Sequence, residues 1–296
     1  MIKKNKKAMF FTISTILLIG LILAQLKTIY NEDFDIIRDE KRVTTMNYYL
    51  DDIENDIVRA AQIIGTKAMI AIVTNIIETN SFSNDPKKQF KELFLENKLN
   101  GIDNKIMNNT NIYTWIKTNK KIAASKNMEL EIKINNVNIE HNNPWNIQIN
   151  IDTEISLSSN TANYKYNKTI YSDISIIGLE DPNYALNTNN QISNYIKTTS
   201  IINPKSDLLN HVYSHEYITN TLAPDFLDRL KGKTSASKYG IESLVDIPLL
   251  IQNSISIKEK TIVDYLYFSD ISKIDSNIIG MPVWLRIDQE HLNTYS

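Results

Sequence analysis

The chain has 296 residues, and 42% of them are hydrophobic, which is enough to bury a core and too much for a disordered chain. Its 32 basic and 34 acidic residues nearly balance, which argues against a nucleic-acid-binding protein with a concentrated basic face. Because the chain contains no cysteine, disulfides, cysteine-ligated zinc and thiol catalysis are excluded.

An uncharged segment near the N-terminus predicts a membrane anchor. Residues Ala8–Leu26 carry no charge, and as a helix they span roughly 28 Å, close to the thickness of the hydrocarbon core of a bilayer. Lysines cluster before this segment, and acidic residues predominate after it. Because basic flanks stay in the cytoplasm, the sequence predicts a cytoplasmic tail over residues 1–7, a single transmembrane helix over 8–26 and a C-terminus outside.

Two other interpretations of this segment are weaker. The apolar part of a cleaved signal peptide is usually about 7–15 residues long and ends in a small-x-small site. Ile22-Leu23-Ala24 fits such a site poorly, and the apolar stretch is longer. An uncleaved anchor and a cleaved signal peptide both export the rest of the chain. A buried core helix is disfavoured by the lysines before the segment.

Residues 27–79 predict a helical stalk that ends near Thr79 and could break near Asn31 or Gly65. Apolar residues recur at steps of three, four or seven, which places them on one helix face. This stripe either packs on the chain's own head or binds a partner helix in a homo- or hetero-oligomer. In the second case the predicted interface residues are Met46, Leu50, Ile53 and Ile57.

The remaining residues, 80–296, predict an α+β head, with a subdivision near residue 180. Two amphipathic helices are expected at Pro86–Asn97 and Thr110–Ala124. Three period-two runs follow, around residues 128–134, 145–151 and 164–176, with a loop at Asn135-Asn136. They predict an antiparallel meander covered on one face by the apolar end of the long helix.

Signals weaken in the last third of the chain. A short helix is expected over Gln191–Thr199 and another over Asp225–Lys231, while Val263–Phe268 reads as a buried strand.

Few residues suggest chemistry. His211 and His215 are four apart and precede Glu216, but no third ligand lies at a telling distance, so ordinary histidines are more probable than a metal site. Glu180-Asp181 offers oxygens to Ca²⁺, although an ordinary acidic turn is the commoner outcome.

No nucleophile elbow or glycine-rich phosphate loop occurs, so the sequence predicts no enzyme, no cofactor and no metal. Asn108 and Asn167 begin glycosylation acceptor sequences.

Two parts of the chain resemble known groups. Lys6-Lys7-Ala8, followed at once by Met9-Phe10-Phe11-Thr12 and a long apolar run, resembles the class III signal of archaeal type IV pilins and pseudopilins. That resemblance implies cleavage after Ala8. It departs from the pattern at Met9, where such pilins often carry Gln.

Five further segments resemble uncharacterised archaeal membrane-anchored surface proteins, a group that implies a cell-surface setting and no known activity. These segments are Asp56–Gly65, Gly178–Pro182, Phe226–Gly232, Gly240–Val245 and Ile287–Leu292.

The sequence therefore predicts a structural or interaction protein of the membrane, pilin-like in plan, with the lipid bilayer and like subunits as partners and no nucleic acid. Two alternatives remain open at this stage. One is a ligand-binding or sensory ectodomain with a tyrosine-lined pocket. The other is an envelope hydrolase that uses His211, His215 and Glu216.

Overall fold

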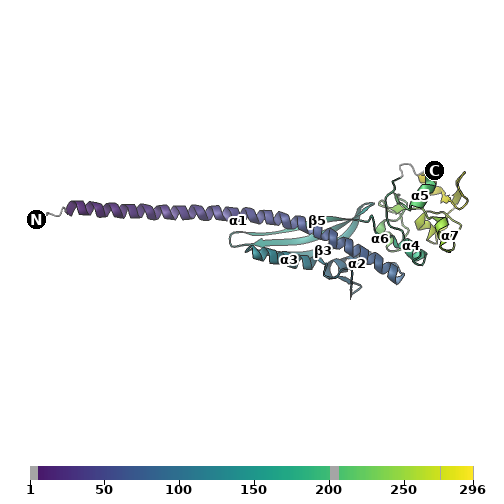
Figure 1. The fold of residues 1–296 in the computed structure, drawn as a ribbon, viewed down its shortest axis with the longest axis horizontal. Coiled ribbons are helices and arrows are strands. Elements are labelled where there is room, and N and C mark those ends of the chain that lie inside the picture. The colour runs from purple at the N-terminus through teal and green to yellow at the C-terminus, as the bar shows by residue number, and fades with distance from the viewer. Residues whose placement is uncertain (1–5, 201–206, 274, 296) are drawn as a thin grey trace.

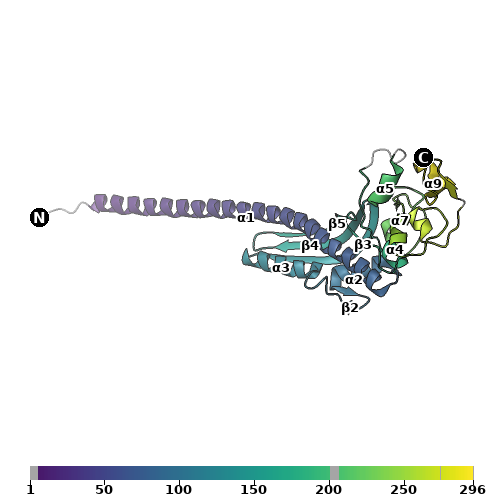
Figure 2. The same cartoon turned by 45° about the vertical axis from the view of Figure 1, so that its right-hand side comes forward.

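A computed structural model describes residues 6–200, 207–273 and 275–295, and within these ranges the side chains of residues 14–27 and of residue 40 onward. One very long helix, α1, projects far beyond a head of mixed α and β structure (Figure 1). Turned by 45°, the molecule shows the same arrangement, with the C-terminal elements at the end of the head farthest from the N-terminus (Figure 2).

Helix α1 runs without a break from Lys6 to Thr79. The predicted end at Thr79 is confirmed, and neither Asn31 nor Gly65 interrupts the helix. Asn80 ends it in a left-handed conformation with φ of 49°. The backbone N–H of Ser81 then bonds to the carbonyl of Ile76 and that of Asn80 to Ile77, a Schellman motif that satisfies the last carbonyls.

The predicted meander is present as a three-stranded antiparallel sheet in the order β3-β4-β5. Its strands are β3 (Glu129–Asn143), β4 (Asn146–Ser158) and β5 (Asn163–Ser175). In β4 every second residue is buried, so one face of the sheet is covered and the other is open.

The loop predicted at Asn135-Asn136 is wrong, because β3 continues through it with a β-bulge between Ile134 and Asn136. The bulge shifts the buried positions from even to odd numbers, so Ile132 and Ile139 both face the core. A continuous strand without the extra residue would turn one of them to solvent.

Three helices cover the buried face of the sheet. Helix α2 (Pro86–Glu96) begins at the N-cap Asp85, whose carboxylate accepts from the N–H of Lys88 at 3.1 Å, and Pro86 is its first residue. Helix α3 (Ile112–Ser125) is capped by Asn111 in the same way. A small ribbon of β1 (Lys98–Leu99) and β2 (Ile102–Asp103) joins them.

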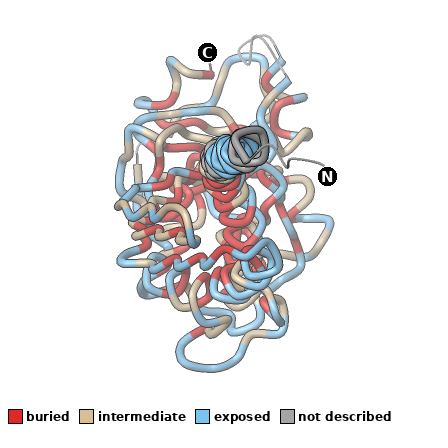
Figure 3. Tube along the Cα trace, turned by 90° about the vertical axis from the view of Figure 1, so that its left-hand side faces the viewer, coloured by how far each residue is buried: buried red, intermediate tan, exposed pale blue. Residues whose placement is uncertain are grey.

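The third covering helix is α1, whose apolar stripe lies along β5 and β4. Viewed along the helix from its N-terminal side, the exposed part of α1 stands in front of a head whose buried residues gather behind it (Figure 3). Polar contacts fix the register: Tyr166 donates to Glu54 at 2.8 Å, and Ser172 donates to the carbonyl of Val58 at 2.8 Å.

The C-terminal part has little regular structure and is built from short elements around a second apolar cluster. Its helices and strands are α4 (Pro182–Asn187), α5 (Leu208–Ser214), β6 (Ile218–Thr219), α6 (Phe226–Arg229), β7 (Ile241–Glu242), α7 (Ile247–Gln252), α8 (Asp264–Tyr267), β8 (Asp275–Asn277), β9 (Arg286–Asp288) and α9 (Gln289–Tyr295). The strands pair only as two antiparallel ribbons, β6 with β7 and β8 with β9.

Two predicted elements of this part are wrong. The strand expected over Val263–Phe268 is wrong: Val263 forms a single bridge to Leu244, and the chain then enters the one-turn helix α8, where Asp264 is held by Arg229 and Tyr265 by His291. Residues Gln191–Thr199 form isolated bridges and no helix, since Tyr195 pairs with Glu180 and Thr198 with Tyr217.

By length and composition, α1 is the one helix among the described residues that could cross a membrane. Two of its parts are apolar. Within Glu40–Thr79, 56% of the most apolar 18-residue window is buried, whereas Ser14–Lys27 lies on the part of α1 that projects away from the head (Figure 1). The Glu40–Thr79 part is therefore a core helix, because its apolar side chains already have protein partners.

Gly65 is the point of closest approach between α1 and the sheet. A Cβ atom added there would lie 2.6 Å from the Cδ1 atoms of both Ile149 and Ile174, whereas one added at Gly20 of the same helix meets nothing within 4 Å. We predict that Gly65→Leu lowers the free energy of unfolding of the head by about 3 kcal/mol through overpacking. Gly20→Leu should leave it unchanged. Urea unfolding of both variants in detergent tests this, and equal stabilities would contradict it.

Candidate functional site

A buried arginine is the centre of the C-terminal part. Arg229 closes the short helix α6, which begins at the N-cap Asp225, and its side chain is 1% exposed. Its Nη1 donates to Asp181 at 2.7 Å and to Asp264 at 2.9 Å. Its Nη2 donates to Asp264 at 3.1 Å and to the carbonyl of Ile241. We call Arg229, Asp181 and Asp264 the arginine network.

Both carboxylates of the arginine network are placed by helix starts. Asp181 follows the turn at Gly178 and caps α4 by accepting from the N–H of Asn183 at 3.0 Å. Asp264 is the first residue of α8 and accepts from Ser243 at 2.8 Å. Tyr217 donates to Asp181 at 2.9 Å, so every carboxylate of the network has further donors.

One cation faces two acids in this network, and neither acid is exposed. Burial raises the pKa of Asp181, and Arg229 opposes that shift only in part. Burial by itself lowers the pKa of Arg229, but the adjacent Asp264 and Asp181 raise it well above its usual range. The guanidinium of Arg229 therefore stays charged, and its positive charge compensates the buried carboxyl groups of Asp181 and Asp264.

A second buried cluster surrounds His291, which lies in α9. Its Nδ1 lies 2.8 Å from Asp288, and its Nε2 lies 3.3 Å from Glu242 and 3.0 Å from the hydroxyl of Tyr265. Tyr295 donates to Glu242 at 2.9 Å. We call these five residues the histidine network. Burial by itself lowers the pKa of His291, but the hydrogen bonds to Asp288 and Glu242 outweigh it and raise the pKa to about 9.

Tyr265, His291 and Asp288 stand in the order of a nucleophile, a base and an orienting acid. All three are buried, and the Tyr265 hydroxyl also lies 3.1 Å from the carbonyl of Leu222. No substrate can approach a hydroxyl enclosed in this way. The arrangement therefore holds the fold together and is not suited to turnover.

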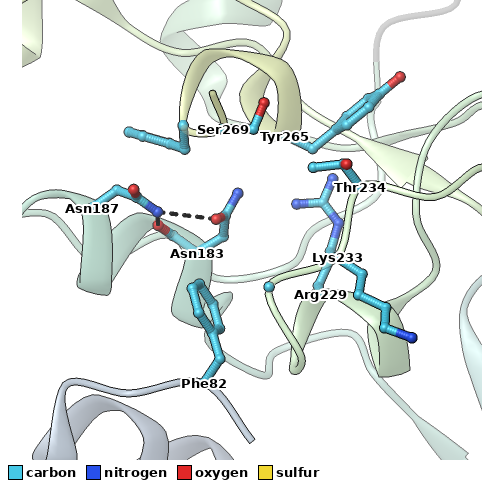
Figure 4. Close-up of a pocket in the computed structure, with 10 residues that line it drawn as sticks. Phe82, Asn183, Asn187, Arg229, Lys233, Thr234, Tyr265 and Ser269 are labelled. Atoms are coloured by element: carbon cyan, nitrogen blue, oxygen red, sulfur yellow. Dashed lines mark hydrogen bonds between the residues drawn. The ribbon is translucent and has the colours of Figure 1, made fainter. Parts of the chain in front are cut away.

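A small hollow opens beside Arg229, and Figure 4 shows its lining. Phe82 from the loop after α1 faces Asn183 and Asn187 of α4 across it, and Tyr265 directs its hydroxyl away from it. Its volume of about 70 Å³ holds a few water molecules and is far below the several hundred Å³ of a usual ligand pocket. Tyr265 is the single tyrosine that lines this hollow, so the hollow is not the tyrosine-lined pocket considered in the sequence analysis.

The four predicted interface residues lie inside the head. Met46 is 0% exposed, Leu50 7%, and Ile53 and Ile57 2% each. They pack against the chain's own sheet and α3, so the partner-helix interpretation of the stripe is replaced by self-packing. The physical reason is that the sheet has one apolar face, and this stripe is what covers it.

The structure separates the predicted chemical residues. His211 is buried in α5 with neither ring nitrogen hydrogen-bonded, while His215, at the left-handed end of that helix, lies 3.3 Å from Asp246. Glu216 accepts from the N–H of Ser200 at 2.9 Å. Asp181 belongs to the arginine network and is not open to Ca²⁺. No group of three residues suited to a metal occurs among the described residues.

The predicted modification sites fall on exposed positions. Asn108 lies in the loop between β2 and α3, and Asn167 lies on the open face of β5, where Thr169 donates to Asp152 at 2.8 Å. The predicted cut after Ala8 falls in the first turns of α1, where the structure describes no side chains.

Sequence reasoning missed both networks as sites. The signal lay in charged residues within apolar runs, namely Arg229 in DFLDRLK and Asp264 in VDYLYF. Four of the five segments on which the predicted resemblance is based contribute to the networks, through Asp181, Arg229, Glu242 with Ser243, and Asp288 with His291.

Comparison of the chain with protein-family models, with curated proteins and with solved structures finds no match.

Removal of Arg229 should unfold the C-terminal part. Arg229→Met leaves Asp181 and Asp264 buried without a cation, which we expect to cost about 3 to 5 kcal/mol of the free energy of unfolding. Arg59→Met is the control, because the Arg59 side chain is 74% exposed and pairs only loosely with Asp56 at 3.8 Å. Chemical unfolding monitored by tyrosine fluorescence measures both, and similar losses for the two variants would refute a central role for Arg229.

The histidine network should make stability depend on pH. Because the folded pKa of His291 is raised to about 9 from an ordinary value near 6.5, its contribution is complete below pH 6.5 and is lost as the pH rises through 9. The loss amounts to up to about 3 kcal/mol. The decline between pH 6.5 and 9 should be flatter in His291→Gln. Parallel stability profiles for the two proteins would show that His291 does not hold the extra proton.

Proposed function

We propose that the protein is a membrane-anchored structural or interaction protein of the cell exterior, pilin-like in plan. Its N-terminal apolar segment sits in the lipid bilayer, the rest of α1 continues as a stalk, and the head faces outward. In this role it assembles with like subunits or presents the head at the cell surface.

One observation carries the anchor proposal: residues 14–26 of α1, which lie beyond the head, are uncharged and exposed. Eight large apolar side chains between Ile16 and Leu26 are 49–68% exposed. Leaving them in water forgoes on the order of 10 kcal/mol of burial free energy. A bilayer removes all of them from water at once, and the lysines before the segment favour a cytoplasmic N-terminus.

The continuity of α1 supports the stalk. Among the described side chains of α1, Met46 is the first that is fully buried, and it lies 20 residues beyond Leu26, or roughly 30 Å along an α-helix. The proposal therefore places the head well clear of the lipid headgroups, where contact with other subunits or surfaces is open to it.

The internal chemistry of the head favours a structural role over an enzymatic or sensory one. The acids and histidines of the two networks are buried against each other, and the hollow beside Arg229 is small. The larger hollows of the head, of about 510 and 580 Å³, are lined by other residues and contain no member of either network.

The lack of cysteine allows a direct test of topology in intact cells. We expect the Asn160→Cys variant, altered in the exposed turn between β4 and β5, to react with a membrane-impermeant maleimide on whole cells. In protein whose intact mass shows that residues 1–8 are retained, the Lys4→Cys variant should react only after the membrane is permeabilised. If neither thiol reacts until cells are broken, the head is not outside.

The anchor itself is tested by matched charge insertions in α1. Leu17→Lys with Leu21→Lys should release the protein from carbonate-washed membranes, because each lysine costs about 3 kcal/mol near the centre of a membrane helix. Ile63→Lys with Ile70→Lys makes the same change at exposed positions of the same helix beside the head and should leave the protein in the membrane. Equal retention of both double variants would sink the proposal.

A further inference from the structure

The head presents two opposite faces of unlike charge. Residues 85–127, which form the α2 and α3 side of the helical layer, contain nine lysines and four acidic residues, whereas the sheet, residues 129–175, contains six acidic residues and three lysines. The α1 side of the layer, residues 40–79, contains six acidic and four basic residues. The helices cover one face of the sheet and turn their own outer side to solvent, while the other sheet face is open. We call these surfaces the lysine face and the open sheet face.

Much of this charge has no partner within the chain. On the lysine face, Lys87, Lys88, Lys117 and Lys121 are exposed and form no ion pair among the described residues. On the open sheet face, the Glu129 side chain makes no hydrogen bond or ion pair with any described residue. Among the same residues, the Glu140 carboxylate accepts only from Asn150, at 2.8 Å. The pairs Lys120–Glu131 and Lys165–Glu154 neutralise only part of the two faces.

Each face also carries an exposed apolar anchor. Tyr171 projects from the open sheet face and is 57% exposed. Tyr113 and Ile122 on α3 are 48% and 42% exposed and flank the lysines of that helix. Interfaces between proteins commonly set aromatic anchors within a charged rim, because the apolar contact supplies affinity and the charges supply orientation.

The dimensions of the open sheet face suit a protein interface. Strands of 13 residues extend over roughly 44 Å, and three of them with their side chains are about 15 Å wide. This corresponds to roughly 650 Å² for each partner, or about 1,300 Å² in total, which is the range of a specific standard-size contact.

We propose that the open sheet face of one molecule binds the lysine face of a second copy of this chain. The contact is heterologous, because two different surfaces meet, so it propagates into rows or rings instead of closing as a two-fold dimer. The strands run alongside α1 (Figure 1), so in an anchored molecule both faces point sideways, within the plane of the membrane. This inference rests on the proposed function and specifies its subunit contact.

Charge-reversal variants of the full chain in detergent test the contact. Glu129→Lys with Glu140→Lys removes the acidic excess of the open sheet face, and Lys117→Glu with Lys121→Glu removes most of the basic excess of the lysine face. Self-association of the wild-type chain, followed by analytical ultracentrifugation, should weaken as salt rises. Each double variant should raise the dissociation constant by about tenfold or more. Asp51→Lys with Asp52→Lys on the exposed side of α1 is the control and should associate like the wild type.

Rescue distinguishes this arrangement from nonspecific attraction. A one-to-one mixture of the two double variants should form mixed pairs with wild-type affinity, because the unaltered lysine face of the first variant meets the unaltered open sheet face of the second. Neither variant alone should form such pairs. Because Asn167 lies on the open sheet face, the protein is used without glycans, as verified by intact mass.

A wild-type chain that is monomeric at every salt concentration, or reversals without effect, or the absence of rescue, would overturn the inference. Association that depends only on the apolar end of α1 would be insensitive to salt and would overturn it as well. The cell-labelling result is independent of these outcomes, so the anchor can stand while this contact fails.

Discussion

The packing of one apolar stripe of α1 on one face of a three-stranded sheet is the constraint on which the structure depends. The sheet has a single covered face, and α1 supplies much of its cover. Gly65 lets the helix approach until the side chains of Ile149 and Ile174 meet its backbone. Since the same helix continues to Lys6 without a break, whatever fixes its N-terminal part also fixes the orientation of the head.

The C-terminal part solves a different physical problem. It has short helices and ribbons whose strands are two or three residues long, so backbone hydrogen bonding alone contributes little to its order. Buried charge takes over part of this role: Arg229 joins α6 to α4, α8 and β7, and His291 joins α9 to β7 and α8. A buried ion pair adds little stability compared with an apolar replacement, but loss of one partner is costly, and such pairs suit the specification of one arrangement.

Whether an element of the fold could be predicted depends on how far apart in the sequence the interacting residues lie. Helix α2 and the meander were predictable because their signals are local, namely the cap at Asp85 and the period-two runs. The bulge at Asn135 was not, since both registers look alike until the core face is known. In the C-terminal part, VDYLYF has a strand-like composition but is helical, because Asp264 is drawn to Arg229, 35 residues away. The networks could not be predicted because their partners are distant in sequence.

The apolar stripe of the stalk shows the same limit. Its heptad-like spacing is compatible with a partner helix or with the chain's own sheet, and periodicity does not distinguish them. In the structure the burial of Met46 and Leu50 settles the choice for this segment. In the proposed function, contacts with other subunits therefore fall to the outer surfaces of the head, where the unlike charges of its two faces become relevant.

The central claim is that a single rigid helix connects the apolar N-terminal segment to the head. The distance between spin labels at Gln25→Cys and Asn55→Cys, measured by pulsed electron resonance on the full chain in lipid nanodiscs, tests it most directly. Both positions are exposed, and no native cysteine competes for the label. An unbroken helix of 30 steps predicts one narrow distribution centred at roughly 45 Å. A broad distribution, or one centred well below that distance, would show that α1 bends or unwinds between the lipid and the head.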